Sequence, residues 1–166
     1  RLDIKNMSVH ELVALGRSPY TGFWGKLTPE DHKEINKAIS LVKITHLTHR
    51  MVHTLSDGER QKAMIAKALA QNTPVIFLDE PTAFLDLVNR VRVMHLLRDI
   101  AHGMGKGVLL STHDLRTALD LADRILLVHE GKAWSGTPQE AVTGAVLGRA
   151  FSGGGLEFDA ATGTLR

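Results

Sequence analysis

Apolar residues recur every three or four positions over residues 35–42, which predicts a helix with one buried face. Thr28 precedes Pro29, and this pair opens the helix because proline is tolerated in the first helical turn. Two other segments, Ser8–Glu11 and Ser56–Glu59, carry a serine followed three residues later by glutamate, the pattern of a capping box at a helix start. The first part of the chain is therefore predicted to be helical, with the first helix ending at Gly16 and a loop at 17–27.

The second half of the chain alternates between short apolar runs and longer helical patterns. The predicted strands are 75–78, 108–110 and 125–128, and the predicted helices are 86–102, which ends at Gly103, and 115–122. A strand–helix–strand–helix–strand order is typical of an α/β layer with a parallel sheet. The run 75–78 is apolar at every position, which favours a strand buried on both faces.

The last forty residues predict smaller elements. Glu130-Gly131 indicates a turn into residues 132–135, and Pro138 opens another helix. The tail contains Gly153–Gly155 and Thr162-Gly163, which predict a loop and a small hairpin.

Composition narrows the classes of protein that fit. The chain has 166 residues, suited to one domain or most of one, and its 43% apolar content is too high for a disordered chain. A net charge of +2 with scattered Lys and Arg does not favour a nucleic-acid partner. There is no cysteine, so disulfides and thiolate chemistry are excluded, and no apolar run approaches the roughly 20 residues of a membrane helix.

An acidic pair, Asp79-Glu80, directly follows the first predicted strand. Ligands of open α/β sheets bind at the carboxyl ends of the strands. An aspartate there can hold Mg²⁺ directly or through water, and a neighbouring glutamate can orient and deprotonate an attacking water molecule. The alternative is a polar strand end that only turns toward solvent.

The Ser56–Glu59 capping box could also have a chemical role. A helix N-terminus presents unpaired N–H groups and partial positive charge, so it attracts phosphate. Gly58 would allow a ligand to approach the backbone, and the hydroxyl of Ser56 could donate a hydrogen bond. The alternative is an ordinary helix start.

His113 follows the second predicted strand and is expected at the same edge of the sheet as Asp79-Glu80. An imidazole in that position could contact a terminal phosphate. The alternative is polar surface.

Taken in order, these elements resemble the ATPases of ABC transporters. The resemblance is carried by a signature sequence at 55–61, a Walker B strand at 75–80, a D-loop at 83–86 and an H-loop at His113. It covers almost the whole chain. It implies an incomplete P-loop NTPase core with parallel strands and an N-terminal helical subdomain, divided as 1–72 and 73–166.

The resemblance also implies roles for individual residues. Asp79 would serve Mg²⁺, Glu80 would be the general base for ATP hydrolysis, and His113 would contact the γ-phosphate. Signature residues Ser56, Gly58 and Glu59 would belong to the nucleotide site of the other subunit in a head-to-tail homodimer, and Asp86 would link the two sites. Asp57 departs from the glycine usual in the family, and we infer that its carboxylate points away from the nucleotide.

Within the family, the chain is most similar to ATPases that import iron complexes, the siderophore, haem and cobalamin systems. Residues 9–20, the signature and Gly136-Thr137-Pro138 carry this similarity. It implies an energy-coupling subunit at the cytoplasmic face of the membrane, with an integral-membrane permease as partner and a substrate-binding protein acting indirectly. The transported substrate is not encoded in such a subunit.

No segment matches the phosphate-binding loop G-x-x-x-x-G-K-[ST] that the family requires. Residues 22–27 and 103–107 come near it but have the wrong spacing or the wrong order relative to strands. We therefore expect an N-terminally truncated chain that is inactive alone and that associates through exposed strand edges. Two alternatives remain: a non-catalytic partner-binding fragment, and a soluble ABC ATPase that does not transport.

Overall fold

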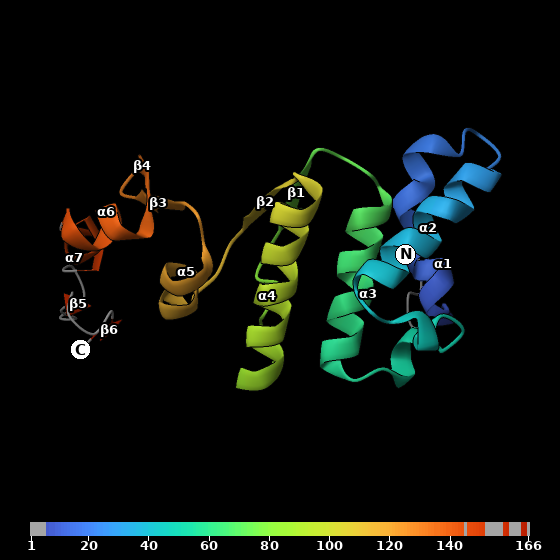
Figure 1. The fold of residues 1–166 in the computed structure, drawn as a ribbon, viewed down its shortest axis with the longest axis horizontal. Coiled ribbons are helices and arrows are strands. Elements are labelled where there is room, and N and C mark those ends of the chain that lie inside the picture. The colour runs from blue at the N-terminus through green and yellow to red at the C-terminus, as the bar shows by residue number, and fades with distance from the viewer. Residues whose placement is uncertain (1–5, 145, 152–157, 160–163, 166) are drawn as a thin grey trace. The chain divides into compact units, whose positions relative to one another are not determined.

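The computed structural model describes residues 6–144, 146–151, 158–159 and 164–165 (Figure 1). By its internal contacts the chain divides into two compact units, Arg1–Ser111 and Thr112–Arg166. The first contains the helical part and a parallel strand pair, and the second contains shorter helices and hairpins. The family resemblance predicts a different division, between residues 72 and 73, which separates functional subdomains. That division stays a prediction.

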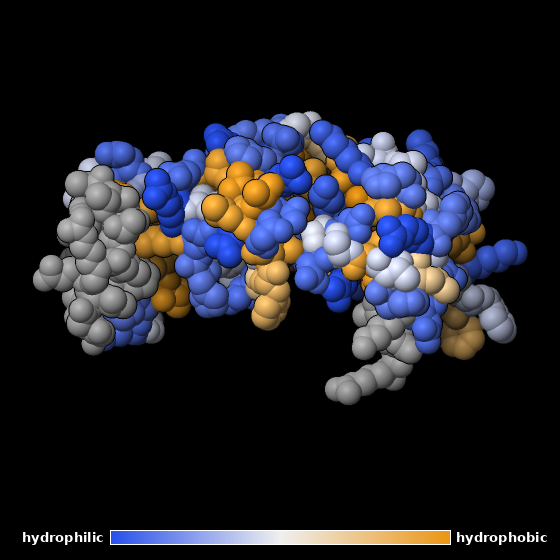
Figure 2. Space-filling view, turned by 90° about the horizontal axis from the view of Figure 1, so that it is seen from below, coloured by the Kyte–Doolittle hydropathy of each residue, from blue (hydrophilic) through white to orange (hydrophobic). Residues whose placement is uncertain are grey.

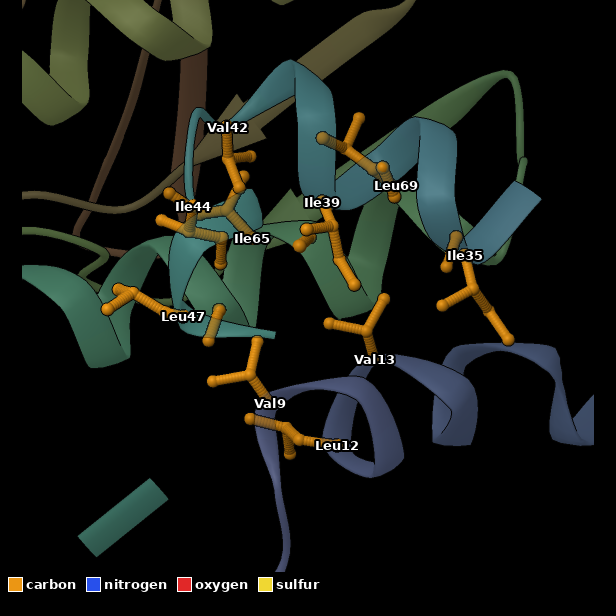
Figure 3. Close-up of a cluster of buried hydrophobic side chains, with 14 of the residues drawn as sticks. Val9, Leu12, Val13, Ile35, Ile39, Val42, Ile44, Leu47, Ile65 and Leu69 are labelled. Carbon is orange, nitrogen blue, oxygen red and sulfur yellow. The ribbon is translucent and has the colours of Figure 1, made fainter. Parts of the chain in front are cut away.

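The helical part of the first unit packs around helix α3. Its elements are α1 (Val9–Ala14), η2 (Leu15–Tyr20), α2 (Pro29–Leu41), η3 (Thr45–Leu47), η4 (Val52–Thr54) and α3 (Asp57–Ala70). Helices α1 and α2 contact each other, and both contact α3. The core between them is aliphatic and almost fully buried, with Val9, Leu12, Ile35, Ile39 and Ile65 among its members (Figure 3).

Local capping signals start these helices where the sequence predicts. Ser8 and Ser56 each accept the N3 backbone N–H while the N3 glutamate binds the serine N–H in return, and Thr28 does the same with Asp31. The predicted loop at 17–27 is partly wrong. The chain continues past Gly16 as the 3₁₀ turn η2, because Arg17 and Tyr20 bind the last carbonyl groups of α3 and hold the turn in place.

The parallel layer consists of β1 (Val75–Leu78) and β2 (Gly107–Leu110), paired from Val75↔Gly107 to Leu78↔Leu110. Helix α4 (Leu87–Met104) connects them. The helix ends two residues later than predicted, since the left-handed residue that terminates it is Gly105, with φ 60°, and not Gly103.

The prediction that β1 is buried on both faces is wrong for the described residues. Ile76 is 4% exposed and joins the core with Val93 and Leu97 of α4, but Val75 is 43% and Phe77 73% exposed. In the part of the chain that the structure describes, the β1–β2 pair is two-stranded and only the Ile76 face is covered. The space-filling view shows apolar side chains at the surface among polar ones (Figure 2).

The second unit contains α5 (Leu115–Leu121), β3 (Ile125–His129), β4 (Lys132–Gly136), α6 (Pro138–Thr143), α7 (Val146–Phe151), β5 (Phe158–Asp159) and β6 (Thr164–Leu165). The third predicted strand is present as β3, which pairs antiparallel with β4. The predicted turn joins the two strands, with Glu130 (φ 47°) and Gly131 (φ 72°) as a two-residue connection. The predicted place of β3 in the parallel sheet stays a prediction.

The antiparallel pairing of β5 with β6 agrees with the predicted tail hairpin, and the expected loop residues Gly153–Gly155 and Thr162-Gly163 lie outside the described residues. Helices that could cross a membrane, by length and apolar content, are absent from the described residues.

Candidate functional site

Asp79 and Glu80 lie at the carboxyl end of β1, beside the end of β2, as predicted for a parallel pair. Ser111, the first residue after β2, joins the two ends. Its backbone N–H donates to the carbonyl of Leu78 at 3.0 Å, and its hydroxyl donates to Oδ1 of Asp79 at 2.6 Å. The backbone N–H of Glu80 donates to the same hydroxyl oxygen at 2.9 Å. The arrangement fixes the Asp79 carboxylate at the sheet edge.

Glu80 adopts a backbone conformation that is uncommon for a residue with a β-carbon. Its φ is 43°, in the left-handed region, and such residues typically cost about 1 kcal/mol or more. The bond to Ser111 and the turn that follows hold it there, since the N–H of Ala83 donates to the Glu80 carbonyl at 3.0 Å. Pro81 and Thr82 beneath this turn are buried, while Asp79 is exposed and Glu80 half-buried. Hydrogen bonds therefore hold the Asp79 carboxylate and the Glu80 backbone at this strand end.

A groove of about 520 Å³ opens beside Asp79. It is lined by residues of η2, α3 and β1, including Ser18, Gln61, Lys67, Gln71, Phe77 and Asp79. The lining includes both apolar and polar side chains. Because Asp79 is exposed and lines the groove, a ligand can reach this end of β1.

The N-terminus of α3 is closed by its own capping box. The hydroxyl of Ser56 donates to Oε2 of Glu59 at 2.9 Å and accepts the Glu59 backbone N–H at 3.4 Å, while the Ser56 N–H also binds Oε2. The backbone N–H and then the hydroxyl of Ser56 hold the pKa of Glu59 below its usual range. A phosphate bound here would compete with the Glu59 carboxylate for these donors.

Two neighbours of this cap have other contacts. Asp57 forms an ion pair with Arg60 one turn along α3, and both side chains are exposed. Gly58 is buried, and a β-carbon placed on it would lie 3.2 Å from Cγ and Oδ1 of Asn89 on α4. A side chain at this position would therefore crowd Asn89 where α3 packs against α4.

Asp86 caps helix α4. Its Oδ1 accepts the backbone N–H of Asn89 at 2.8 Å and its Oδ2 accepts the Asn89 side-chain amide at 2.8 Å. The backbone N–H of Asn89 is the main cause that lowers the pKa of Asp86. Phe84 lies two residues before Asp86, in the loop between β1 and α4. Its φ is 64° and its side chain is 96% exposed, so this loop presents an aromatic side chain to solvent.

His113 is exposed and lies in the second unit, next to Asp114, which caps α5. Its predicted location beside Asp79-Glu80 stays a prediction. The structure does bring together Asp79 with Glu80, and Gly58 with the Asp86–Asn89 pair. Ser111 and Asn89 were not among the predicted site residues. The signal for Ser111 was its place as the first polar residue after the second strand. The signal for Asn89 was a side-chain amide three residues after a helix N-cap.

Comparisons with known proteins agree with the arrangement of these motifs. Residues 3–83 match the family model described as ABC transporter. The chain is 36% identical over 155 residues to the petrobactin import ATP-binding protein FpuC of Bacillus anthracis, covering 93% of this chain and 56% of that protein. It is 37% identical over 147 residues to the ferric enterobactin transport ATP-binding protein FepC of Escherichia coli K12, covering 88% and 54%.

Solved structures show the same fold. A metal-chelate type ABC transporter in an inward-facing conformation superposes with a TM-score of 0.82 at 32% identity, over 88% of this chain and 58% of that one. A nucleotide-free ATP-binding cassette gives a TM-score of 0.75 at 20% identity, over 89% and 62%. The chain spans about half the length of the curated relatives it matches.

Proposed function

This chain belongs to the ABC transporter family of ATP-binding proteins, and on that premise we propose that the complete protein is the ATP-hydrolysing, energy-coupling subunit of an importer. The observation that carries the proposal is the acidic pair at the end of β1, fixed to β2 through Ser111. ABC cassettes hydrolyse ATP at such a strand end.

The residues at the end of β1 fit a Mg²⁺ ion. Asp79 supplies hard oxygen ligands at an accessible sheet edge, suited to Mg²⁺ directly or through water. When bound with ATP, the ion would neutralise charge on the phosphates. Glu80 would orient and deprotonate the attacking water, and its backbone is held beside Asp79 by the bond to Ser111.

The remaining predicted residues belong to the same proposal. His113 would contact the γ-phosphate, and Ser56, Gly58 and Glu59 would face ATP held by the other subunit of a head-to-tail homodimer. For Ser56 this requires its hydroxyl to leave Glu59 Oε2, which it binds at 2.9 Å. Asp86 would connect the two nucleotide sites.

We infer that the complete protein lies at the cytoplasmic face of the membrane and binds an integral-membrane permease there, with a substrate-binding protein acting through that permease. The cargo would be an iron complex, because the relatives include importers named for petrobactin, achromobactin and ferric enterobactin. One relative is named for cobalamin import, so cobalamin is tested as a second candidate cargo.

Phosphate release by the complete purified protein tests the proposal. Glu80→Gln is expected to lower the turnover at least about 100-fold while ATP binding is retained, because the general base is lost and the shape is kept. Glu34→Gln, on α2 and away from the strand ends, is the matched control and should keep wild-type turnover. Unchanged turnover in Glu80→Gln would remove Glu80 from this role.

Residues 1–166 alone are expected to show no ATP hydrolysis, because their sequence contains no phosphate-binding loop. Co-purification of the complete protein with a permease, followed by uptake of radiolabelled iron complexes or cobalamin, tests the transport role and the cargo. Co-sedimentation with ribosomes and no permease contact would instead favour the soluble, non-transport class.

A further inference from the structure

Asn89 connects two segments whose predicted roles belong to different nucleotide sites. Its side-chain amide donates to Oδ2 of Asp86 at 2.8 Å, and its backbone N–H donates to Oδ1 of the same carboxylate at 2.8 Å. The side-chain bond holds the Asn89 amide against the Asp86 carboxylate, and the backbone bond is part of the Asp86 cap. Asp86 is the last residue of the loop that begins at Glu80. A short stretch of chain therefore connects the Asp86–Asn89 pair to the acidic end of β1.

The other side of the Asn89 amide lies against the first turn of α3. A β-carbon on Gly58 would lie 3.2 Å from Asn89 Cγ and Oδ1, tighter than ordinary van der Waals contact, and 3.5 Å from Nδ2, an ordinary contact distance. Gly58 itself is buried. The absence of a side chain at Gly58 therefore lets the Asn89 amide fill this space while it remains bonded to Asp86.

We propose that Asn89 is a positioning residue that couples Asp86 to the Gly58 turn of α3 within one chain. A shift of Asp86 then moves Asn89 and presses on the start of α3, where Ser56 and Glu59 form their cap. The consequence for hydrolysis rests on the proposed function. The link itself is a property of the fold and is tested separately.

A double-mutant cycle in the complete protein tests the link. Alanine normally stabilises a helix relative to glycine. Gly58→Ala should nevertheless lower stability when Asn89 is present, and raise it or leave it unchanged in the Asn89→Ala background, where the space is open. The expected coupling is about fivefold or more in the unfolding equilibrium constant, measured by urea denaturation.

Gly103→Ala is the matched control. Gly103 lies within α4 and a β-carbon there has no atom within 4 Å, so alanine should stabilise both backgrounds equally. Additive effects at Gly58 and Asn89 would overturn the proposal. If Gly58→Ala does not fold, recovery of folding in the double variant supports the link, and failure of both overturns it.

The effect on hydrolysis is read with Asn89→Asp, which keeps the shape but replaces the N–H donor with a charge facing Asp86. We expect turnover to fall about tenfold with KM for ATP unchanged within about twofold, since the proposal gives Asn89 a positioning role and no contact with ATP. Unchanged turnover would overturn the positioning role. A wild-type protein that does not hydrolyse ATP would refute the proposed function and leave the stability cycle valid.

Discussion

A single buried guanidinium, that of Arg17, joins three segments of the helical part. Its Nε donates to Oδ1 of Asp31 at 2.8 Å, its Nη1 donates to the carbonyl of Ala70 at 2.9 Å, and the ring of Tyr20 lies 4.0 Å from its Cζ. The Arg17 side chain is 9% exposed and that of Asp31 3%. Asp31 also caps α2, where Thr28 N–H, Thr28 hydroxyl and Arg17 lower its pKa to about 2. The Asp31 carboxylate therefore stays ionised at neutral pH.

Arg17→Met is expected to lower the melting temperature by about 5–10 °C, because it leaves the Asp31 carboxylate buried without its partner and the Ala70 carbonyl without its donor. Differential scanning calorimetry of the purified chain measures the change. Arg98→Met is the matched control, since Arg98 is exposed on α4, and should shift the melting temperature by about 1–2 °C at most. Equal shifts in the two variants would show that the Arg17 network adds nothing to stability.

His10 gives a pH dependence that can be assigned to one residue. Partial burial lowers its pKa below 6.5, followed by the charges of His32 and His49, while Glu11 opposes them. The His32 ring is stacked at 6.0 Å from that of His10. Because the folded state binds this proton less tightly than the unfolded state, its contribution to stability is complete above pH 6.5 and is lost as the pH falls below that value.

His10→Gln should therefore reduce the loss of stability between pH 7.5 and pH 5.5, which urea denaturation at the two pH values measures. His102→Gln, at the last turn of α4, serves as the control and should keep the wild-type slope. An unchanged slope in His10→Gln would assign the pH dependence to other histidines.

At the scale of elements, local signals were predictable and distant partners were not. The starts of α1, α2 and α3 depend on residues three apart, as in Ser8 with Glu11, so the sequence alone predicts them. The 3₁₀ turn η2 depends on contacts of Arg17 and Tyr20 with residues 51 to 53 positions away, which no local pattern reveals. The hairpin of β3 with β4 belongs to the predictable class, because its partner strand follows the local turn at Glu130-Gly131.

The same division applies to the candidate site. Asp79 and Glu80 were predictable because an acidic pair directly follows an apolar run. Ser111 and Asn89 have only weak local signals, because their importance arises when β2 pairs with β1 and α4 packs on α3. Sequence motifs thus indicate the residues that act on a ligand better than those that hold them in place.

Neighbouring positions of β1 offer a matched test of its uncovered face. Phe77→Ala should change the free energy of unfolding by less than about 1 kcal/mol, because Phe77 is 73% exposed. Ile76→Ala should cost about 2–4 kcal/mol, because Ile76 is 4% exposed in the core. Urea denaturation distinguishes the two.

Exposed apolar side chains on a strand pair also favour association between chains. We expect the chain to self-associate at high micromolar concentration and Phe77→Ala to weaken this association, as measured by light scattering. A wild-type chain that stays monomeric under these conditions would contradict the expectation.

At the scale of the whole molecule, buried apolar side chains are distributed unevenly between the two units. Within the described residues, the main core cluster runs from Val9 to Ile100 and lies entirely in the first unit. The buried apolar side chains described in the second unit are Ile125, Ala141 and Leu147. Because regions with few buried apolar contacts open at lower free energy, the two units should differ in local stability.

Hydrogen exchange of the chain measures this difference directly. Backbone N–H groups in the middle of α3 should exchange at least about tenfold more slowly than those of the β3–β4 hairpin, although both are hydrogen-bonded within regular elements. The parallel pair β1–β2 is an internal control, since it lies in the first unit and Ile76 attaches it to the core. Equal protection of α3 and of β3–β4 would mean that the second unit is stabilised as strongly as the first despite its smaller buried core.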